Sequence, residues 1–250
     1  MAYKTLHIAA ALLGTSLAGA ALAHQPWVLT DPGHAQSGTQ ATIQPFFGHA
    51  FPYDDPLQTD RIAELIIVDG TGETVTLDAA ANNELQTPEL SEGVHVVALR
   101  QARGYWSQTT EGGRPAPRSE LDNVVSCGYS DNGAKTLVVV GNSGPSAATK
   151  ALGHRLEIIL RDDITEPASG DVVEVRVLLE GEPHAGPLLA FHSSSGEDPY
   201  QVTDTDSDGH ADVRLEGNGP WKLLAHGEID YPEPAVCDVE RLNASLTFGY

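Results

Sequence analysis

The stretch VVEVRVLLEG, residues 172–181, decides the fold class, because apolar and polar residues alternate along most of it. In an extended chain, one face would carry the apolar side chains Val173, Val175, Val177 and Leu179. A period of two predicts a β-strand whose one face is buried. No stretch of the chain carries a sustained helical stripe. We therefore expect an all-β protein built from antiparallel sheets.

Further strand-like segments lie on both sides of a segment of small, flexible composition, GNSGPSAATKALG (141–153). They are short, rich in Val, Ile, Leu and Thr, and separated by Gly, Pro, Asn and Asp. They are residues 39–47, 62–69, 73–77, 94–100 and 135–141, then 155–160, 172–181, 186–193, 211–217, 221–227 and 242–248. We expect two antiparallel β-sandwich domains, residues 24–148 and 149–250, the second immunoglobulin-like or transthyretin-like.

Residues 1–23 have the pattern of a signal peptide. Lys4 is followed by an apolar run and by Ala21-Leu22-Ala23, an A-x-A cleavage site. A transmembrane helix is the alternative, but glycine and hydroxyl residues dilute the run. We expect cleavage, a mature chain that begins at His24, and a periplasmic location. No second hydrophobic span follows, so no membrane insertion is expected after cleavage.

The net charge of −21 argues against nucleic acid or an anionic membrane as a partner. It suits solubility and also suits the attraction of cations.

Two cysteines are present, Cys127 and Cys237. In an oxidising compartment such a pair typically forms a disulfide, which here would tie the two expected domains together. The alternative, a pair of thiolate metal ligands, lacks a short chelating motif.

Histidines are numerous for an acidic exported chain, which favours a transition-metal site. His24 is the first candidate, because cleavage would give it an α-amine and an imidazole that chelate one metal; a frayed terminus is the alternative. Pro26 has no N–H, so other ligands must come from elsewhere in the fold. His49, in FFGHAFPYDD, is an oriented ligand or a packed core residue. His226, which ends an apolar strand, is the third candidate.

The segment DTDSDGHAD (204–212) resembles the first half of a calcium loop, with Asp204, Asp206, Asp208 and Asp212 around Gly209. The bidentate glutamate of such a loop would fall at residue 215, which is Leu. An Asp/Gly-rich hairpin turn is the preferred interpretation. Motifs of catalysis are scarce, since no G-x-S-x-G elbow, phosphate loop or H-E-x-x-H helix occurs, and we expect no enzyme.

Several blocks together resemble a family of exported proteins of largely unknown function. They include AHQPWVLTDPG (23–33), GHAFPYDDP (48–56), CGYSDNGAKTLVVVG (127–141) and HGEIDYPEPAVCD (226–238). Members of that family are commonly described as periplasmic accessory proteins of nickel or cobalt uptake transporters. The resemblance implies metal ligands at His24, His49 and His226, a nickel or cobalt ion, and a membrane permease as partner. The start, HQPW, departs from close relatives and leaves copper or zinc open.

Two other functions compete with metal uptake. One is a structural or adhesive exported β-sandwich, stabilised by calcium at residues 204–212. The other is a copper protein built on a histidine brace, which needs an N-terminal His and a second His that face each other.

Overall fold

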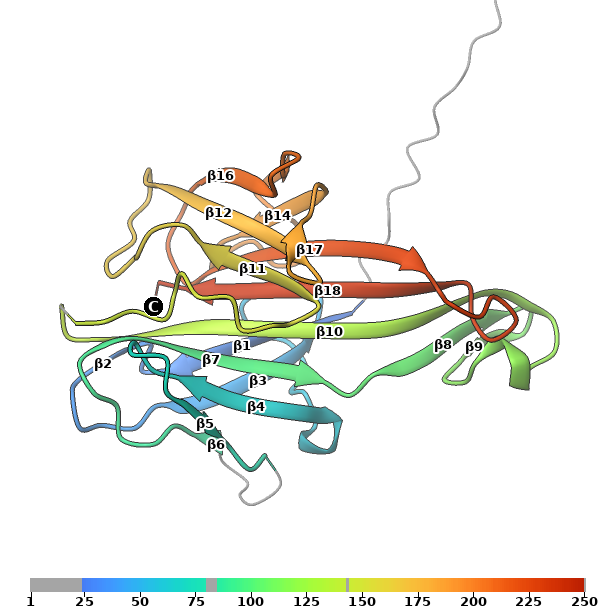
Figure 1. Cartoon of the computed structure of the whole chain (residues 1–250), viewed down its shortest axis with the longest axis horizontal. Coiled ribbons are helices and arrows are strands. Elements are labelled where there is room, and N and C mark those ends of the chain that lie inside the picture. Colours follow the sequence, from blue (N-terminus) through green and yellow to red (C-terminus); the bar gives the residue numbers. More distant parts are fainter. Residues whose placement is uncertain (1–23, 80–84, 143, 250) are drawn as a thin grey trace, which may run out of the picture.

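Strands make up nearly all the regular structure in a computed structural model of the protein, which describes residues 24–79, 85–142 and 144–249 (Figure 1). The expected signal peptide, residues 1–23, lies outside these ranges. Two single-turn 3-10 helices, η1 (Thr59–Arg61) and η2 (Arg118–Glu120), are the helical elements of the described chain. The predicted all-β fold class is confirmed.

An 11-stranded sheet forms the centre of the molecule. Its main order is β15 (Gln201–Asp204), β14 (Pro187–Phe191), β17 (Trp221–Asp230), β18 (Val239–Phe248), β10 (Val124–Val140), β7 (Gly93–Gln101), β4 (Ile62–Val68) and β5 (Thr74–Thr76). Three more strands join it: β2 (His34–Ala35) and β8 (Gly104–Thr109) pair with β10, and β9 (Gly112–Arg114) pairs with β8.

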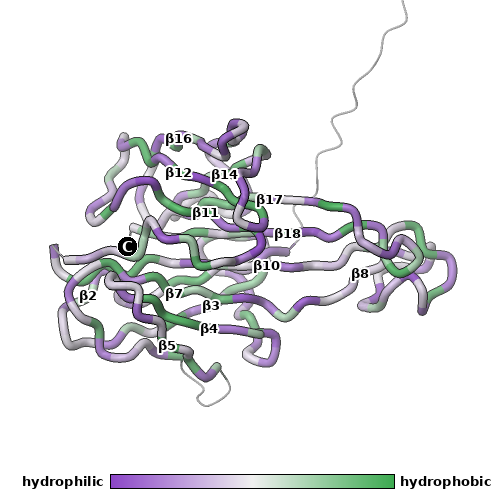
Figure 2. The backbone as a smooth tube through the Cα atoms, viewed as in Figure 1, coloured by the Kyte–Doolittle hydropathy of each residue, from purple (hydrophilic) through white to green (hydrophobic). Residues whose placement is uncertain are grey.

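Two smaller sheets cover the opposite faces of the central sheet. One consists of β1 (Gln25–Asp31), β3 (Thr42–Gly48) and β6 (Leu85–Gln86), and the other of β11 (Leu156–Leu160), β12 (Val172–Leu179), β13 (Glu182–Pro183) and β16 (His210–Arg214). On β7, Val97 packs with the first of these sheets and its neighbour Val96 with the second. Successive side chains of a strand point to opposite faces, so β7, which is buried at nearly every position, packs on both of its faces. Figure 2 shows hydrophobic stretches along the strands of these layers.

The central sheet runs across the boundary expected after residue 148. β10 and β18 pair in parallel, from Gly128 opposite Val239 to Thr136 opposite Thr247, so the sheet is mixed rather than purely antiparallel. Parallel neighbours need a long connection, and here all the residues between the two strands supply it. The hydrophobic core on one face likewise draws on both halves of the chain. The division into two domains stays a prediction.

An arm extends from the layered body, built from β8, β9, the first part of β10 and the connection between β17 and β18 (Figure 1). The predicted disulfide is confirmed within it: Cys127 of β10 is bonded to Cys237 of that connection, with their Cα atoms 5.0 Å apart. Both cysteines are buried. Asp238 adds a second tie, because its carboxylate accepts hydrogen bonds from the Arg118 guanidinium and from the Cys127 N–H.

Candidate metal centre

Hydroxyl groups of β18 hold the first strand in place. β1 is an edge strand of its sheet, so the carbonyl groups on its outer side lack a strand partner. Ser245 Oγ donates a hydrogen bond to the carbonyl of Pro26 at 2.8 Å, and Thr247 Oγ1 donates to that of Val28. The position of the chain just after residue 23 is therefore fixed by residues near the end of the last strand.

The pairing of β1 with β3 brings two of the predicted ligands together. Gln25 is opposite Gly48 in the antiparallel register, so the next pair outward is His24 and His49. His49 Nε2 lies 3.1 Å from His24 Nδ1, and the ring centroids are 4.2 Å apart. The His24 ring also stacks on Phe47, with centroids 5.5 Å apart. His24 is exposed, so its ring nitrogens are accessible to an ion from solvent.

Asp54 shapes the turn that carries His49. Its Oδ2 accepts hydrogen bonds from the backbone N–H groups of His49 and Ala50, each at 2.7 Å. A Cβ at Gly48 would lie 2.2 Å from this oxygen, so the close approach requires glycine there. The pKa of Asp54 is lowered, chiefly by the hydrogen bond from Ala50, with burial opposing and the His49 N–H adding to the effect. An ionised Asp54 thus sets the backbone from which His49 projects.

A buried lysine lies behind these two segments. Lys222 of β17 is 0% exposed, and its Nζ lies 4.4 Å from the ring centroid of Trp27, 5.1 Å from that of Phe51 and 4.2 Å from that of Phe191. Its Nζ has no hydrogen-bond partner among the described residues. Burial lowers the pKa of Lys222 to about 7, against the opposing charge of Asp54.

The two segments next to the histidines contribute two of the three rings of this aromatic cage around Lys222, and β14 contributes the third. Trp27 follows His24 on β1, and its indole N–H donates to the carbonyl of Pro52 at 2.8 Å. Phe51 belongs to the turn that carries His49. The cage therefore joins β1 to that turn.

His226 lies at the end of a row of side-chain amides that crosses four strands. Asn132 Nδ2 donates to Gln101 Oε1, and Asn243 Nδ2 donates to Asn132 Oδ1. Asn243 Oδ1 is then left to accept a hydrogen bond from the Nδ1–H of His226. This order places the lone pair of His226 on Nε2, which is buried and without a partner among the described residues. Burial lowers the pKa of His226, so the ring is neutral at neutral pH.

The structure joins two of the three predicted ligands. Among the described residues, no group of three or more His, Cys, Asp or Glu side chains is placed to hold one metal ion. His226 is thus not grouped with His24 and His49, and its role as a ligand stays a prediction. Lys222 was missed at the sequence level, although a single lysine on the inward side of the apolar strand WKLLAHG was a visible signal.

Comparison with known proteins identifies the family of the chain. The sequence model of a family described as "Domain of unknown function (DUF4198)" matches residues 21–229. The chain belongs to this DUF4198 family. No curated protein matches it.

Several solved structures are similar to the DUF4198 chain, all at low sequence identity. Murine CEACAM1b is 12% identical, with 90% of this chain and 98% of that one covered, at a TM-score of 0.21. The D0–D1 domain of intimin is 14% identical, with coverage of 89% and 97% and a TM-score of 0.22. Fibronectin(III)-like modules of CbhA from Clostridium thermocellum are 7% identical, with coverage of 89% and 94% and a TM-score of 0.20.

Within the described parts of the DUF4198 chain, no helix is long and apolar enough to cross a membrane.

The Asp-rich segment of the DUF4198 chain connects two different sheets. β15 pairs with β14 and β16 pairs with β12, so the expected hairpin is corrected to a turn between sheets. Asp206 closes this turn, because its Oδ1 accepts the N–H groups of Asp208 and His210, each at 2.9 Å. The pKa of Asp206 is lowered, chiefly by the hydrogen bond from His210. The Asp206 carboxylate therefore already accepts hydrogen bonds from the backbone of the turn.

We expect millimolar Ca²⁺ to leave the melting temperature unchanged, because a calcium ion would compete with the backbone N–H groups for the Asp206 carboxylate. Asp206→Ala should lower the melting temperature slightly, with or without Ca²⁺. Differential scanning fluorimetry with a Ca²⁺ titration checks this. A saturable rise that Asp206→Ala abolishes would instead establish the calcium loop.

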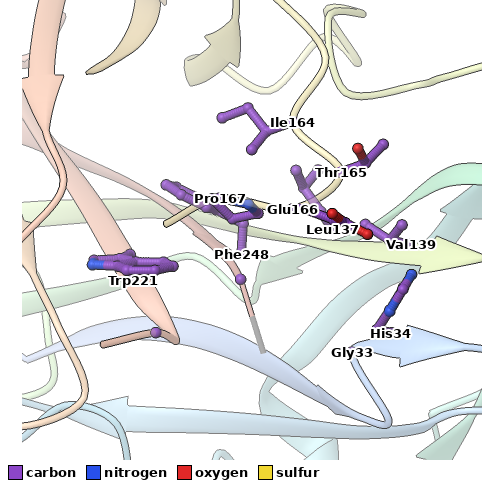
Figure 3. Close-up of a pocket in the computed structure, with 12 residues that line it drawn as sticks. Gly33, His34, Leu137, Val139, Ile164, Thr165, Glu166, Pro167, Trp221 and Phe248 are labelled. Atoms are coloured by element: carbon purple, nitrogen blue, oxygen red, sulfur yellow. The ribbon is translucent and has the colours of Figure 1, made fainter. Parts of the chain in front are cut away.

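A separate cavity of about 350 Å³ lies where the ends of β17 and β18 meet β10 and the loop before β12 (Figure 3). Trp221, Phe248 and Leu137 give it an apolar lining. Its one imidazole, His34, lies 3.2 Å through Nε2 from the Gly141 carbonyl, and its one carboxylate is that of Glu166. One imidazole and one carboxylate are a poorer donor set than the paired histidines, so this cavity is a weaker candidate for a metal site than the pair His24 and His49.

Proposed function

We propose that the protein binds one divalent transition-metal ion through His24 and His49 in the periplasm and supplies it to an uptake permease. The observation that carries the proposal is the 3.1 Å distance between His24 Nδ1 and His49 Nε2. Two imidazole nitrogens, each about 2.0–2.1 Å from one metal, are about 2.9 Å apart at a right angle and about 3.4 Å apart at a tetrahedral angle. The 3.1 Å spacing lies between these limits, so it suits one shared ion, although both rings would have to turn from their present hydrogen bond to aim their lone pairs at the ion.

Signal cleavage after Ala23 would add a third nitrogen, the α-amine of His24. The amine and Nδ1 of one histidine close a chelate ring, and His49 Nε2 then completes a set of three nitrogen donors. Nitrogen donors select nickel, cobalt, copper or zinc over calcium and magnesium, which prefer oxygen. The resemblance to accessory proteins of nickel and cobalt uptake favours those two as cargo, and the charge of −21 favours the attraction of cations.

His49→Ala should weaken Ni²⁺ binding at least tenfold, because only one residue would then supply nitrogen donors. His34→Ala is the matched control: His34 is also exposed but belongs to the separate cavity, and its loss should leave the affinity unchanged. Isothermal titration calorimetry of the chain that begins at His24 checks both. Equal binding by wild type and His49→Ala would contradict the proposed site.

A histidine-brace copper protein would use the same three nitrogens, so in vitro affinity does not separate the two functions. Copper binds such donors most tightly of the divalent first-row metals. Metal analysis of protein purified from the periplasm of cells grown with trace metals at balanced levels separates them. Nickel or cobalt in the protein supports uptake, and copper together with oxygen-dependent oxidation supports the copper protein.

A further inference from the structure

Lys222 is the least expected charged residue of the described chain. A buried ammonium is normally paired with a carboxylate, as Lys135 is with Glu157 at 2.9 Å. Lys222 instead faces three aromatic rings and has no hydrogen-bond acceptor among the described residues. Ring faces attract a cation but accept no proton. The residue can therefore lose its proton without breaking a hydrogen bond.

Lys222 lies behind the two segments that carry the histidines, because its ammonium contacts Trp27, three residues after His24, and Phe51, two residues after His49. Asp54, from the turn that carries His49, acts on the charge of Lys222, and that charge in turn acts on His226 of the same strand. β1 and β14 contribute the uncharged rings of Trp27 and Phe191. His24 and His49 pair with each other, and the guanidinium of Arg61 lies over the Phe47 ring on which His24 stacks. A metal ion at these two histidines would add two positive charges beside a cation that one carboxylate, Asp54, now balances.

We propose that the ammonium of Lys222 and a metal ion at His24 and His49 exclude each other, so that metal binding releases a proton from Lys222 to the solvent. This inference rests on the proposed metal centre. The protons balance as follows: when a divalent ion binds, the side chain of Lys222 changes from an ammonium to an amine, and the buffer takes up the released proton. Metal loading and local pH would then be linked through a residue that does not touch the metal.

The size of the linkage follows from the titration of Lys222. With a pKa of about 7, Lys222 is mostly charged at pH 6, half charged at pH 7 and mostly neutral at pH 8. If only the neutral form permits metal binding, the wild-type affinity is reduced about tenfold at pH 6, about twofold at pH 7 and hardly at all at pH 8. Protonation of the nitrogen ligands lowers the metal affinity at low pH in every variant. The difference in affinity between Lys222→Met and wild type therefore reports the effect of Lys222 alone.

Lys222→Met tests the linkage, because methionine replaces the apolar stem of the side chain, ends one atom short of Nζ and has no charge. Compared with wild type, it should bind Ni²⁺ about tenfold more tightly at pH 6 and equally at pH 8. At pH 7 it should release about half a proton fewer per ion, measured by calorimetry in buffers of different ionisation enthalpy. Lys150→Met, which removes a lysine bonded to the Gly70 carbonyl, should behave as wild type.

A second measurement covers the case in which Lys222→Met does not fold. The wild-type chain, labelled with ¹⁵N-lysine, can be titrated by NMR with and without diamagnetic Zn²⁺. The pKa of Lys222 should fall by at least one unit when Zn²⁺ is bound. Metal binding with an unchanged Lys222 pKa and unchanged proton release would overturn the linkage and leave the metal centre intact. A wild-type chain that binds no metal would overturn both.

Discussion

A single glycine added before His24 is expected to weaken Ni²⁺ binding at least tenfold, or about 1.4 kcal/mol. The extra residue leaves the imidazole 3.1 Å from His49 Nε2 but converts the α-amine into an amide. An amide nitrogen must lose a proton before it can bind a metal, so the chelate ring of His24 is lost. Titration of three chains at neutral pH checks this: the chain that starts at His24, the same chain with the added glycine, and His24→Ala.

The added glycine is a sharp test because nothing in the described fold changes. β1 begins at Gln25, and its ties to Ser245 and Thr247 start at Pro26. Equal melting temperatures for the three chains would show that the fold is retained. If all three chains bind Ni²⁺ equally, His24 is not a ligand, and His49 and His226 become the first residues to test.

Removing the disulfide should lower the free energy of unfolding by about 2–5 kcal/mol. Cys127 and Cys237 are 110 residues apart in the sequence, so their bond restricts a long loop of the unfolded chain. Both side chains are buried, so Cys127→Ala with Cys237→Ala also leaves a small void. Urea unfolding of this double variant against wild type gives the difference.

Asp238 offers a matched control for that experiment. Asp238→Asn removes the carboxylate that pairs with Arg118 and accepts the Cys127 N–H, but it keeps the disulfide. Because this ion pair is partly exposed, its loss should be clearly smaller than the loss of the disulfide. A double cysteine variant as stable as wild type would mean that strand pairing alone holds the arm.

Apolar composition bounded by turn residues predicted most of the long strands of the central sheet, and period-two alternation was clearest in β12 of a covering sheet. These signals missed β8 and β9 of the arm, and also β1, where Pro26 and the sequence HQPW resemble a loop more than a strand. Proline is tolerated there because β1 lies at the edge of its sheet. The parallel pairing of β10 with β18 was also beyond prediction, since neither strand carries a local signal for a partner about a hundred residues away.

The candidate site was predicted in part for a similar reason. The histidines were visible as residue types, but the distance between His24 and His49 depends on the register of β1 against β3. The aromatic cage depends on rings from three separate segments that meet around Lys222. Such features arise from tertiary packing, which a single sequence does not reveal. His226 was also a candidate in the sequence, yet the fold does not group it with the other two.

The dependence of β1 on β18 has a consequence for how the protein matures. Residues 24–31 are made early, but the hydroxyl groups that anchor them, on Ser245 and Thr247, are made more than two hundred residues later. β18 also lies between β10 and β17, so the central sheet stays split until it is inserted. Pairing over such long separations is slow. A chain still under synthesis would therefore lack an ordered His24–His49 pair, and competence to capture a metal would arrive only with the last strand.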